Sequence, residues 1–407
     1  MKKILIVFFI GVLTSYASND KYRLMLRNNA STSVVIGWNQ ISGTNPIVYY
    51  GKKDHKTNFS NYSTKKSPDR IVEFRGMNNH FVRLINLSPN TAYYFVIKDS
   101  EGVSERFWFT TAPNNKDKIS IISGGDSRNN RKSRQNANKL VSKLKPNIVM
   151  FGGDMTSGDT DKQWIEWMDD WQLTIAKDNR IFPLIAARGN HEKENKSIYN
   201  LFDTPHEKIY YSIPVGKNYL RIYTLNTEIS IPGGQTNWLK NELLSNKKDY
   251  WKIVQYHKPM RPHVSRKREG NFQYLNWAQL FYNENIDLIV ECDAHTVKST
   301  WPIKPSTKKG SEEGFIRDNK NGNVYVGEGC WGAPIRKNDD NKSWTRDSGM
   351  FNQFKWIFVS KKSIITRTIK TDNASLVGEL NNNTRFEIPK NLDIWNPPNG
   401  AIVEIKK

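Results

Sequence analysis

Five short polar motifs occur along this chain, and each stands where an apolar run ends. The runs are typical of buried strands and read ISIIS, NIVMF, PLIAA, WKIVQ and DLIVE. The motifs that follow them contain Asp126, Asp154, Asn190 with His191, His257, and Asp293 with His295. Because ligands bind at the carboxyl ends of strands in open α/β sheets, these polar side chains are expected to converge.

The side chains in these motifs are carboxylates, imidazoles and an amide. Such oxygen and nitrogen donors suit one or two divalent cations. A water molecule bound to a divalent metal is a ready nucleophile near neutral pH. The pattern therefore predicts a metal-dependent hydrolase.

The part of the chain that holds the motifs, residues 118–370, is predicted to be an α/β domain. Apolar residues at helical spacing, as expected for helices that cover a sheet, occur in 138–145, 164–175, 238–245 and 274–282. Later runs read as consecutive strands, so the sheets are predicted to be mixed. One helix face carries Trp164, Trp167 and Trp171; core packing is favoured there, and a stacking platform is the alternative.

The segments on either side of this domain have a different pattern. Residues 19–113 contain short alternating runs separated by turn-forming residues, which predicts a small β-sandwich with Trp38 and Tyr94 in its core. Residues 371–407 are polar and interrupted by proline, and are expected to pack back onto the domains.

The N-terminal residues 1–18 have the layout of a cleaved secretory signal. Two lysines precede an apolar run from Ile4 to Leu13, and small residues follow. This run is too short to span a bilayer comfortably, and no other long apolar stretch is present, so a secreted or periplasmic protein without a transmembrane span is predicted. Cys292 and Cys330 could form a disulfide in such a compartment or stay free, and free thiols are favoured.

The charge balance is strongly basic. The formal net charge is +21 and the pI is about 9.7, which favours anionic partners or substrates. The alternative is that the many lysines reflect genomic composition and general solubility. Nucleic acid stays open as an anionic partner, although no motif indicates it.

Taken together, the motifs resemble those of the calcineurin-like metallophosphoesterases. In that family they read Asp-x-His or a variant, Gly-Asp, Gly-Asn-His-Asp/Glu, a lone His and Gly-His-x-His, in this order. The stretch LSPNTAYYFVIKD followed by FTTAP resembles the end of a fibronectin type III domain, as found ahead of the catalytic domain in purple acid phosphatases. Nearly the whole mature chain is similar to bacterial relatives of those enzymes.

The resemblance implies a ligand set for two metal ions. Asp154 matches the carboxylate that bridges both metals. Asp126 and His295 match ligands of the first metal, while Asn190 and His257 match ligands of the second. The ions expected are divalent and include Mn, Mg, Ca, Fe or Zn.

The resemblance also implies residues that act on the substrate. His191 matches the catalytic histidine, which lies beside the metals and donates a proton to the leaving group or holds a phosphate oxygen. The neighbouring Glu192 is expected to orient it. A basic loop, residues 261–268, follows His257, and His263 resembles a substrate-contacting histidine; a solvated surface run is the alternative.

Three residues depart from the family pattern. Asp293 stands where the second metal's histidine is expected; it keeps a ligand but adds an anion, which favours harder cations over Zn²⁺. Arg128 replaces a metal-binding histidine and is expected to clamp a phosphate. Ser157 replaces the tyrosinate that binds ferric iron in purple acid phosphatases.

The function predicted is an exported metal-dependent phosphohydrolase. It would cleave phosphomonoesters or phosphodiesters by in-line attack of a metal-bound hydroxide. The alternative is a weakly catalytic or non-catalytic binder of anionic polymer, descended from such an enzyme. Two features keep that alternative open. Asp293 replaces an expected histidine, and only Asp126, Asp154 and His295 match ligands of the first metal.

Overall fold

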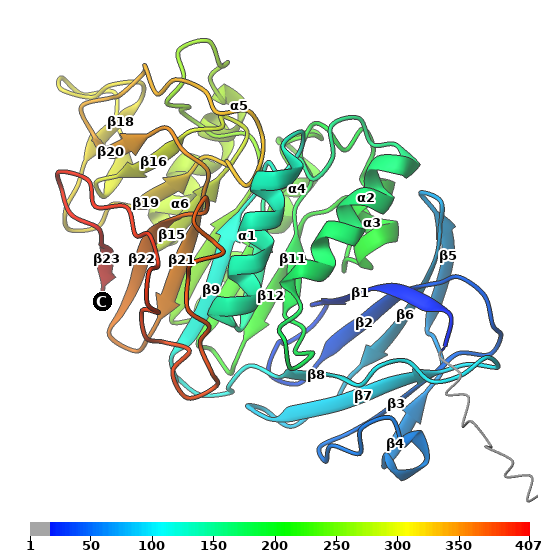
Figure 1. Cartoon of the computed structure of the whole chain (residues 1–407). Coiled ribbons are helices and arrows are strands. Elements are labelled where there is room, and N and C mark those ends of the chain that lie inside the picture. Colours follow the sequence, from blue (N-terminus) through cyan, green and yellow to red (C-terminus); the bar gives the residue numbers. More distant parts are fainter. Residues whose placement is uncertain (1–16) are drawn as a thin grey trace, which may run out of the picture.

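The computed structural model describes residues 17–407, and the predicted signal segment lies outside the described residues apart from Ala17 and Ser18. Figure 1 shows two parts, an all-β domain in blue to cyan and a larger α/β domain that runs from cyan at β9 to red at the C-terminus. The predicted fold class is confirmed: a β-sandwich precedes an α/β domain with mixed sheets. Within residues 17–407, no helix is long and apolar enough to cross a membrane.

The first domain is a sandwich of two antiparallel layers. Its strands are β1 (Asn19–Met25), β2 (Val34–Gln40), β3 (Ile47–Gly51), β4 (Thr64–Lys66), β5 (Arg70–Phe74), β6 (Met77–Leu84), β7 (Ala92–Lys98) and β8 (Phe107–Thr110), with a 3-10 turn, η1, at Phe59–Asn61. Trp38 is fully buried between the layers, as predicted. The prediction for Tyr94 is wrong, because the alternation of β7 buries Tyr93 and turns Tyr94 outward against Trp108.

One sheet of the sandwich continues into the second domain. Its order is β23-β22-β21-β9-β10-β11-β1-β2-β6-β5, and β1 pairs in parallel with β11, with Leu24 opposite Pro183. Fully buried Asp203, which follows α3 of the second domain, accepts two hydrogen bonds of 2.8 Å from Arg83 of β6. The sandwich is therefore built into the sheet that carries the first three polar motifs.

The second domain contains two sheets whose parallel strands lead to the motifs. The strands of the shared sheet in this domain are β9 (Ile119–Gly124), β10 (Ile148–Phe151), β11 (Pro183–Ala186), β21 (Gln353–Val359), β22 (Ser363–Lys370) and β23 (Val403–Lys406). The other sheet has the order β12-β13-β14-β15-β19-β16-β20. Its strands are β12 (Tyr211–Val215), β13 (Leu220–Thr224), β14 (Trp251–Gln255), β15 (Leu288–Glu291), β16 (Val297–Thr300), β19 (Val324–Gly327) and β20 (Thr345–Gly349), and a separate hairpin joins β17 (Ile303–Pro305) to β18 (Phe315–Arg317).

Helices cover the outer faces of these sheets (Figure 1). They are α1 (Arg131–Leu144), α2 (Asp161–Trp171) with η2 (Gln172–Thr174), α3 (Asn195–Phe202), α4 (Gly234–Ser245), and the run α5 (Asn271–Gln273), η3 (Tyr274–Ala278) and α6 (Gln279–Asn283). Asn130 and Thr160 cap α1 and α2, since each side chain accepts a hydrogen bond from the first turn. Trp164, Trp167 and Trp171 are buried. These side chains therefore pack in the core and do not form a stacking platform.

The C-terminal segment from Thr371 lies against the second domain. Lys143 of α1 donates hydrogen bonds of 2.7 and 2.8 Å to the carbonyls of Ala374 and Val377, and β23 pairs with β22. Cys292 and Cys330 are both buried and free, as favoured from the sequence.

Candidate metal centre

Each predicted ligand follows the end of its own strand, at the edge where the two sheets meet. Asp126, Asp154 and Asn190 follow β9, β10 and β11, and His257 and the Asp293–His295 motif follow β14 and β15. The backbone turns sharply at these points, with left-handed φ angles of 58° at Asp126, 56° at Asp154, 65° at Asp293 and 56° at His295. Such conformations are uncommon outside glycine and cluster at functional sites.

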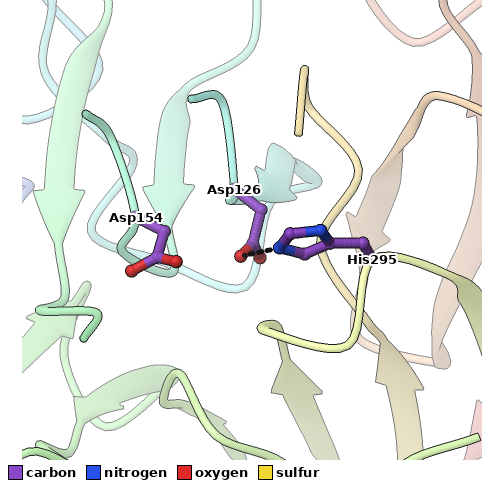
Figure 2. Close-up of side chains that lie close together, drawn as sticks. All are labelled: Asp126, Asp154 and His295. Atoms are coloured by element: carbon purple, nitrogen blue, oxygen red, sulfur yellow. Dashed lines mark ion pairs between the residues drawn. The ribbon is translucent and has the colours of Figure 1, made fainter. Parts of the chain in front are cut away.

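The first donor group consists of Asp126, Asp154 and His295. Their ligand atoms all lie within 4.8 Å of one another, and all three residues are buried. Figure 2 shows the two carboxylates and the imidazole on loops that follow separate strands, with Asp126 Oδ1 3.1 Å from His295 Nε2. These three atoms can surround one cation.

The second donor group consists of Asp154, His257 and Asp293, with Asn190 beside it. His257 Nε2 lies 3.2 Å from Asp154 Oδ1, 3.2 Å from Asn190 Oδ1 and 3.7 Å from Asp293 Oδ1. Asp154 therefore belongs to both groups, as expected of a bridging carboxylate.

The hydrogen bonds of the two histidines show that the groups fit cations. His257 Nδ1 lies 2.9 Å from the Gly152 carbonyl and His295 Nδ1 lies 2.9 Å from the Pro334 carbonyl, so in each ring Nδ1 carries the donating proton. The Nε2 lone pair of each neutral ring then faces carboxylate oxygen. Among the described residues no hydrogen-bond donor reaches the buried Oδ1 of Asp126. A divalent cation between these lone pairs would relieve their repulsion, and without metal a proton on His257 has the same effect in the second group.

In the absence of metal, the close approach of these side chains shifts the pKa values of His257 and Asp154 in the second donor group. Burial opposes a charge on His257, but attraction to Asp154 and Asp126 outweighs it and raises the pKa of His257 well above its usual value. Burial likewise opposes ionisation of Asp154, yet His257 holds the pKa of Asp154 below its usual range. The site thus has a potential that attracts positive charge.

Two glycines allow the ligands to approach so closely. A Cβ atom on Gly329, whose φ is 85°, would lie 2.2 Å from Asp126 Oδ2. A Cβ atom on Gly189 would lie 2.2 Å from Asp154 Oδ1. Side chains at either position would displace a ligand, which explains the glycine in the GNHE motif and in the VGEG strand end.

Glu192 has a role that differs from the predicted one. Instead of contacting the His191 ring, its carboxylate accepts hydrogen bonds from the backbone of Asp154 (2.9 Å), Met155 (2.7 Å) and Gly189 (2.7 Å). Burial and the charge of Asp154 raise the pKa of Glu192 to about 7. Glu192 therefore holds together the two loops that carry Asp154 and Asn190. From its position in the GNHE motif alone, this role could not be distinguished from orienting His191.

His191 is held by the backbone on the open side of the site. Its Nδ1 lies 2.6 Å from the carbonyl of Ser157, and its Nε2 lies 3.8 Å from Asp154 Oδ2. The side chain is 28% exposed, whereas that of Asp154 is fully buried. This arrangement leaves Nε2 of His191 accessible to a substrate, and its catalytic role stays a prediction.

Arg128 points at the metal residues and away from solvent. Its Nε lies 3.3 Å from Asp154 Oδ2 and its Nη2 lies 3.3 Å from His295 Nε2. Only 12% of the side chain is exposed. The guanidinium therefore lies where an anion held over both donor groups would meet it.

Arg128→Lys is expected to keep the metal content and to lower catalytic efficiency. A guanidinium holds two phosphate oxygens at once and an ammonium acts as a point charge, so the loss of transition-state binding should be about 1–3 kcal/mol. Steady-state kinetics on a nitrophenyl phosphate ester measures it. Arg131→Lys is the matched control, because Arg131 lies three residues away and pairs with Asp170. An unchanged efficiency in Arg128→Lys would show that the guanidinium does not touch substrate.

Within the basic loop, Lys267 is the residue that contacts the site. Its Nζ lies 2.6 Å from Asp293 Oδ2, while Asp293 Oδ1 faces His257. The pair adds no net charge, so Lys267 offsets the anion that Asp293 introduces in place of a neutral imidazole. The side chains of Arg261 and His263 lie inside the protein instead: Arg261 donates to the Glu313 carbonyl, and His263 bonds to Thr345 through Nε2 at 2.7 Å. The substrate contact of His263 stays a prediction.

Lys267→Met is expected to change cation and anion binding in opposite directions. Without the ammonium, Asp293 adds an uncompensated negative charge, so divalent metal should bind about tenfold tighter and inorganic phosphate about tenfold more weakly, about 1.4 kcal/mol each. Chelator competition and phosphate inhibition measure the two effects. Lys308→Met, at an exposed loop lysine, is the control. A change of the same sign in both measurements would contradict charge compensation.

Comparison with known families identifies this domain. A family model for Calcineurin-like phosphoesterase matches residues 129–298, which include five of the six predicted ligands. Residues 129–298 belong to a calcineurin-like phosphoesterase domain. A second model, for the N-terminal domain of purple acid phosphatase, matches residues 20–111. Both matches confirm the resemblance inferred from the motifs, and the sandwich precedes the phosphoesterase domain as that resemblance implied.

Curated relatives of this chain are distant. An uncharacterized protein of Mycobacterium tuberculosis is 23% identical over 335 residues, which cover 69% of this chain and 62% of that protein. Acid phosphatase type 7 of Mus musculus is 25% identical over 252 residues, which cover 55% of this chain and 57% of that protein. The chain thus spans about six-tenths of the length of these relatives.

Solved structures share the fold of this chain. The purple acid phosphatase PPD1 from yellow lupin (Lupinus luteus) has a TM-score of 0.73 at 16% identity, covering 88% of this chain and 73% of its own. A structure of PhoD has a TM-score of 0.65 at 12% identity and covers 88% of both chains. These likenesses support the arrangement of the sandwich and the α/β domain.

Proposed function

We propose that this chain is a metal-dependent phosphoester hydrolase. The observation that carries the proposal is the position of Asp154, whose carboxylate belongs to two donor groups, one completed by Asp126 and His295 and the other by His257 and Asp293. The family of the second domain supports the same reaction class. The proposal covers phosphomonoesters and phosphodiesters.

The residues around the metal ligands suit the steps of phosphoester hydrolysis. Bound divalent cations would activate a water molecule and reduce the charge on the phosphate. Arg128, which lies over Asp154 and His295, would hold phosphate oxygens through its guanidinium. His191 Nε2, on the open side, would donate a proton to the leaving alkoxide, while the Ser157 carbonyl keeps the ring in place.

Chelation followed by refilling tests this proposal. The protein is stripped of metal, refilled in turn with Mn²⁺, Mg²⁺, Ca²⁺, Fe²⁺ or Zn²⁺, and assayed for metal per chain and for turnover of nitrophenyl phosphate and bis(nitrophenyl) phosphate. We expect two ions per chain, one for each donor group, and turnover that returns only with metal. The ratio of the two rates assigns the ester class. Turnover that persists without metal would contradict the proposal.

A binder of anionic polymer is the second candidate, and one observation favours it. Arg128 and Lys267 already pair with the carboxylates of Asp154 and Asp293, so the site is partly neutralised by the protein's own cations. In that case the refilled protein would hold less than one metal ion per chain and show no turnover, yet it would retain polyphosphate. The chelation experiment therefore separates the two candidates.

The proposal includes export to the periplasm or the medium. It is supported by the lysines and the apolar run at the N-terminus of the sequence. N-terminal sequencing of protein recovered outside the cytoplasm is expected to start near residue 19. Full-length protein found in the cytoplasmic fraction alone would contradict export.

A further inference from the structure

A cavity of about 600 Å³ adjoins the metal centre. Asp293 is common to both, since its Oδ1 faces His257 and its side chain also lines the cavity. Two segments form most of the walls: residues 227–232, which follow β13, and residues 267–273, which end with α5. A volume of this size lies within the range of about 300–1,000 Å³ that is typical of small-molecule sites.

The walls combine apolar side chains with positive charge near Asp293. Ile229, Ile231 and Pro232 contribute from the first loop, and Phe272 contributes from the second. Phe272 is 61% exposed, although phenylalanine is among the residue types that are most often buried. Lys267 lies at the border between cavity and metal centre, where its ammonium pairs with Asp293. Lys258, Arg268 and Glu269 also line the cavity, so its wall presents charged groups beside the apolar side chains.

We propose that this cavity receives the organic group of the phosphoester, and that this group carries an aromatic or heteroaromatic ring. The inference rests on the proposed function. A phosphate that reaches Asp154 and Arg128 can direct its ester group past Asp293 into the cavity. A flat ring would then pack against Phe272 and Ile229, and water would leave these apolar surfaces. Substrates with small polar groups, such as glycerol phosphate, gain nothing from the same walls.

Phosphonates that cannot be hydrolysed test the inference without a contribution from leaving-group reactivity. Dissociation constants of methylphosphonate and of naphthylmethylphosphonate are measured by calorimetry on the metal-loaded full chain. We expect the naphthyl compound to bind at least about tenfold tighter, because burial of a ring of this size exceeds the 1.4 kcal/mol that a tenfold change represents. Equal affinities would overturn the inference and leave the proposed function standing. If neither compound binds, the proposed function fails as well.

Substitutions in the wall locate the effect. Phe272→Ala and Ile229→Asp should each lower the ratio of the two affinities at least fivefold. Leu275→Ala is the matched control, because Leu275 is 75% exposed in the next turn but does not line the cavity. Phe272 is largely exposed, so its replacement leaves the fold intact, and thermal unfolding checks this point. A preference for the naphthyl compound that survives both substitutions would place the ring elsewhere and overturn the inference.

Discussion

Asp154→Asn is expected to lose both metal ions and to lower turnover by more than about 10³-fold, beyond the cost of removing a single stabilising group. The reason is that the two oxygens of Asp154 serve both donor groups, and an amide offers one oxygen and no charge. Metal analysis and steady-state kinetics on the purified variant measure the two losses. The protein should stay folded, because the substitution conserves shape.

Asp161→Asn is the control for this prediction. Asp161 is in the same domain, at the start of α2, and its side chain is 63% exposed. The Asp161→Asn variant should bind metal and turn over substrate like the unchanged protein. If Asp154→Asn retained near-native metal content, the two groups could not depend on a shared carboxylate.

His191→Ala is expected to leave the metal content intact and to lower turnover by about 10²–10⁴-fold, the range typical of general acid–base catalysis. The expectation follows from the accessible Nε2 and from the Ser157 carbonyl, which holds the ring beside the ligands. The loss should be smaller for esters whose leaving group departs without a proton, so rates across a series of phenyl esters provide the measurement.

His55→Ala in the first domain is the control, since His55 packs against Tyr62 within the sandwich. A metal deficit in His191→Ala would make His191 a ligand and not an acid. A uniform loss across all esters would instead assign it to binding of the phosphate.

The convergence of the site could be predicted because it depends on local patterns. Each ligand stands directly after an apolar run, and parallel strands of one sheet bring their carboxyl ends to one edge. Asp126, Asp154 and His257 therefore lie where the sequence placed them. The sequence also predicted that the tryptophans of α2 lie on one face of the helix. Only the structure could decide whether that face packs in the core or forms a stacking platform.

Other features depend on contacts between distant residues. The pairing of Leu24 with Pro183 joins the sandwich to the central sheet, and no local pattern in either strand signals it. Lys267 pairs with Asp293, but no sequence pattern distinguishes Lys267 from the other basic residues of the loop. Glu192 illustrates the same limit, since its neighbour in sequence is His191 but its hydrogen-bond partners are on other loops.

Anomalous diffraction at the manganese edge, from crystals grown with Mn²⁺, tests the central claim most directly. The account predicts two peaks: one among Asp126, Asp154 and His295, and one among Asp154, Asn190, His257 and Asp293, with Asp154 between them. A single peak away from Asp154, for example at the more exposed acidic group Glu269, Glu313 and Asp340, or no peak at all, would contradict it.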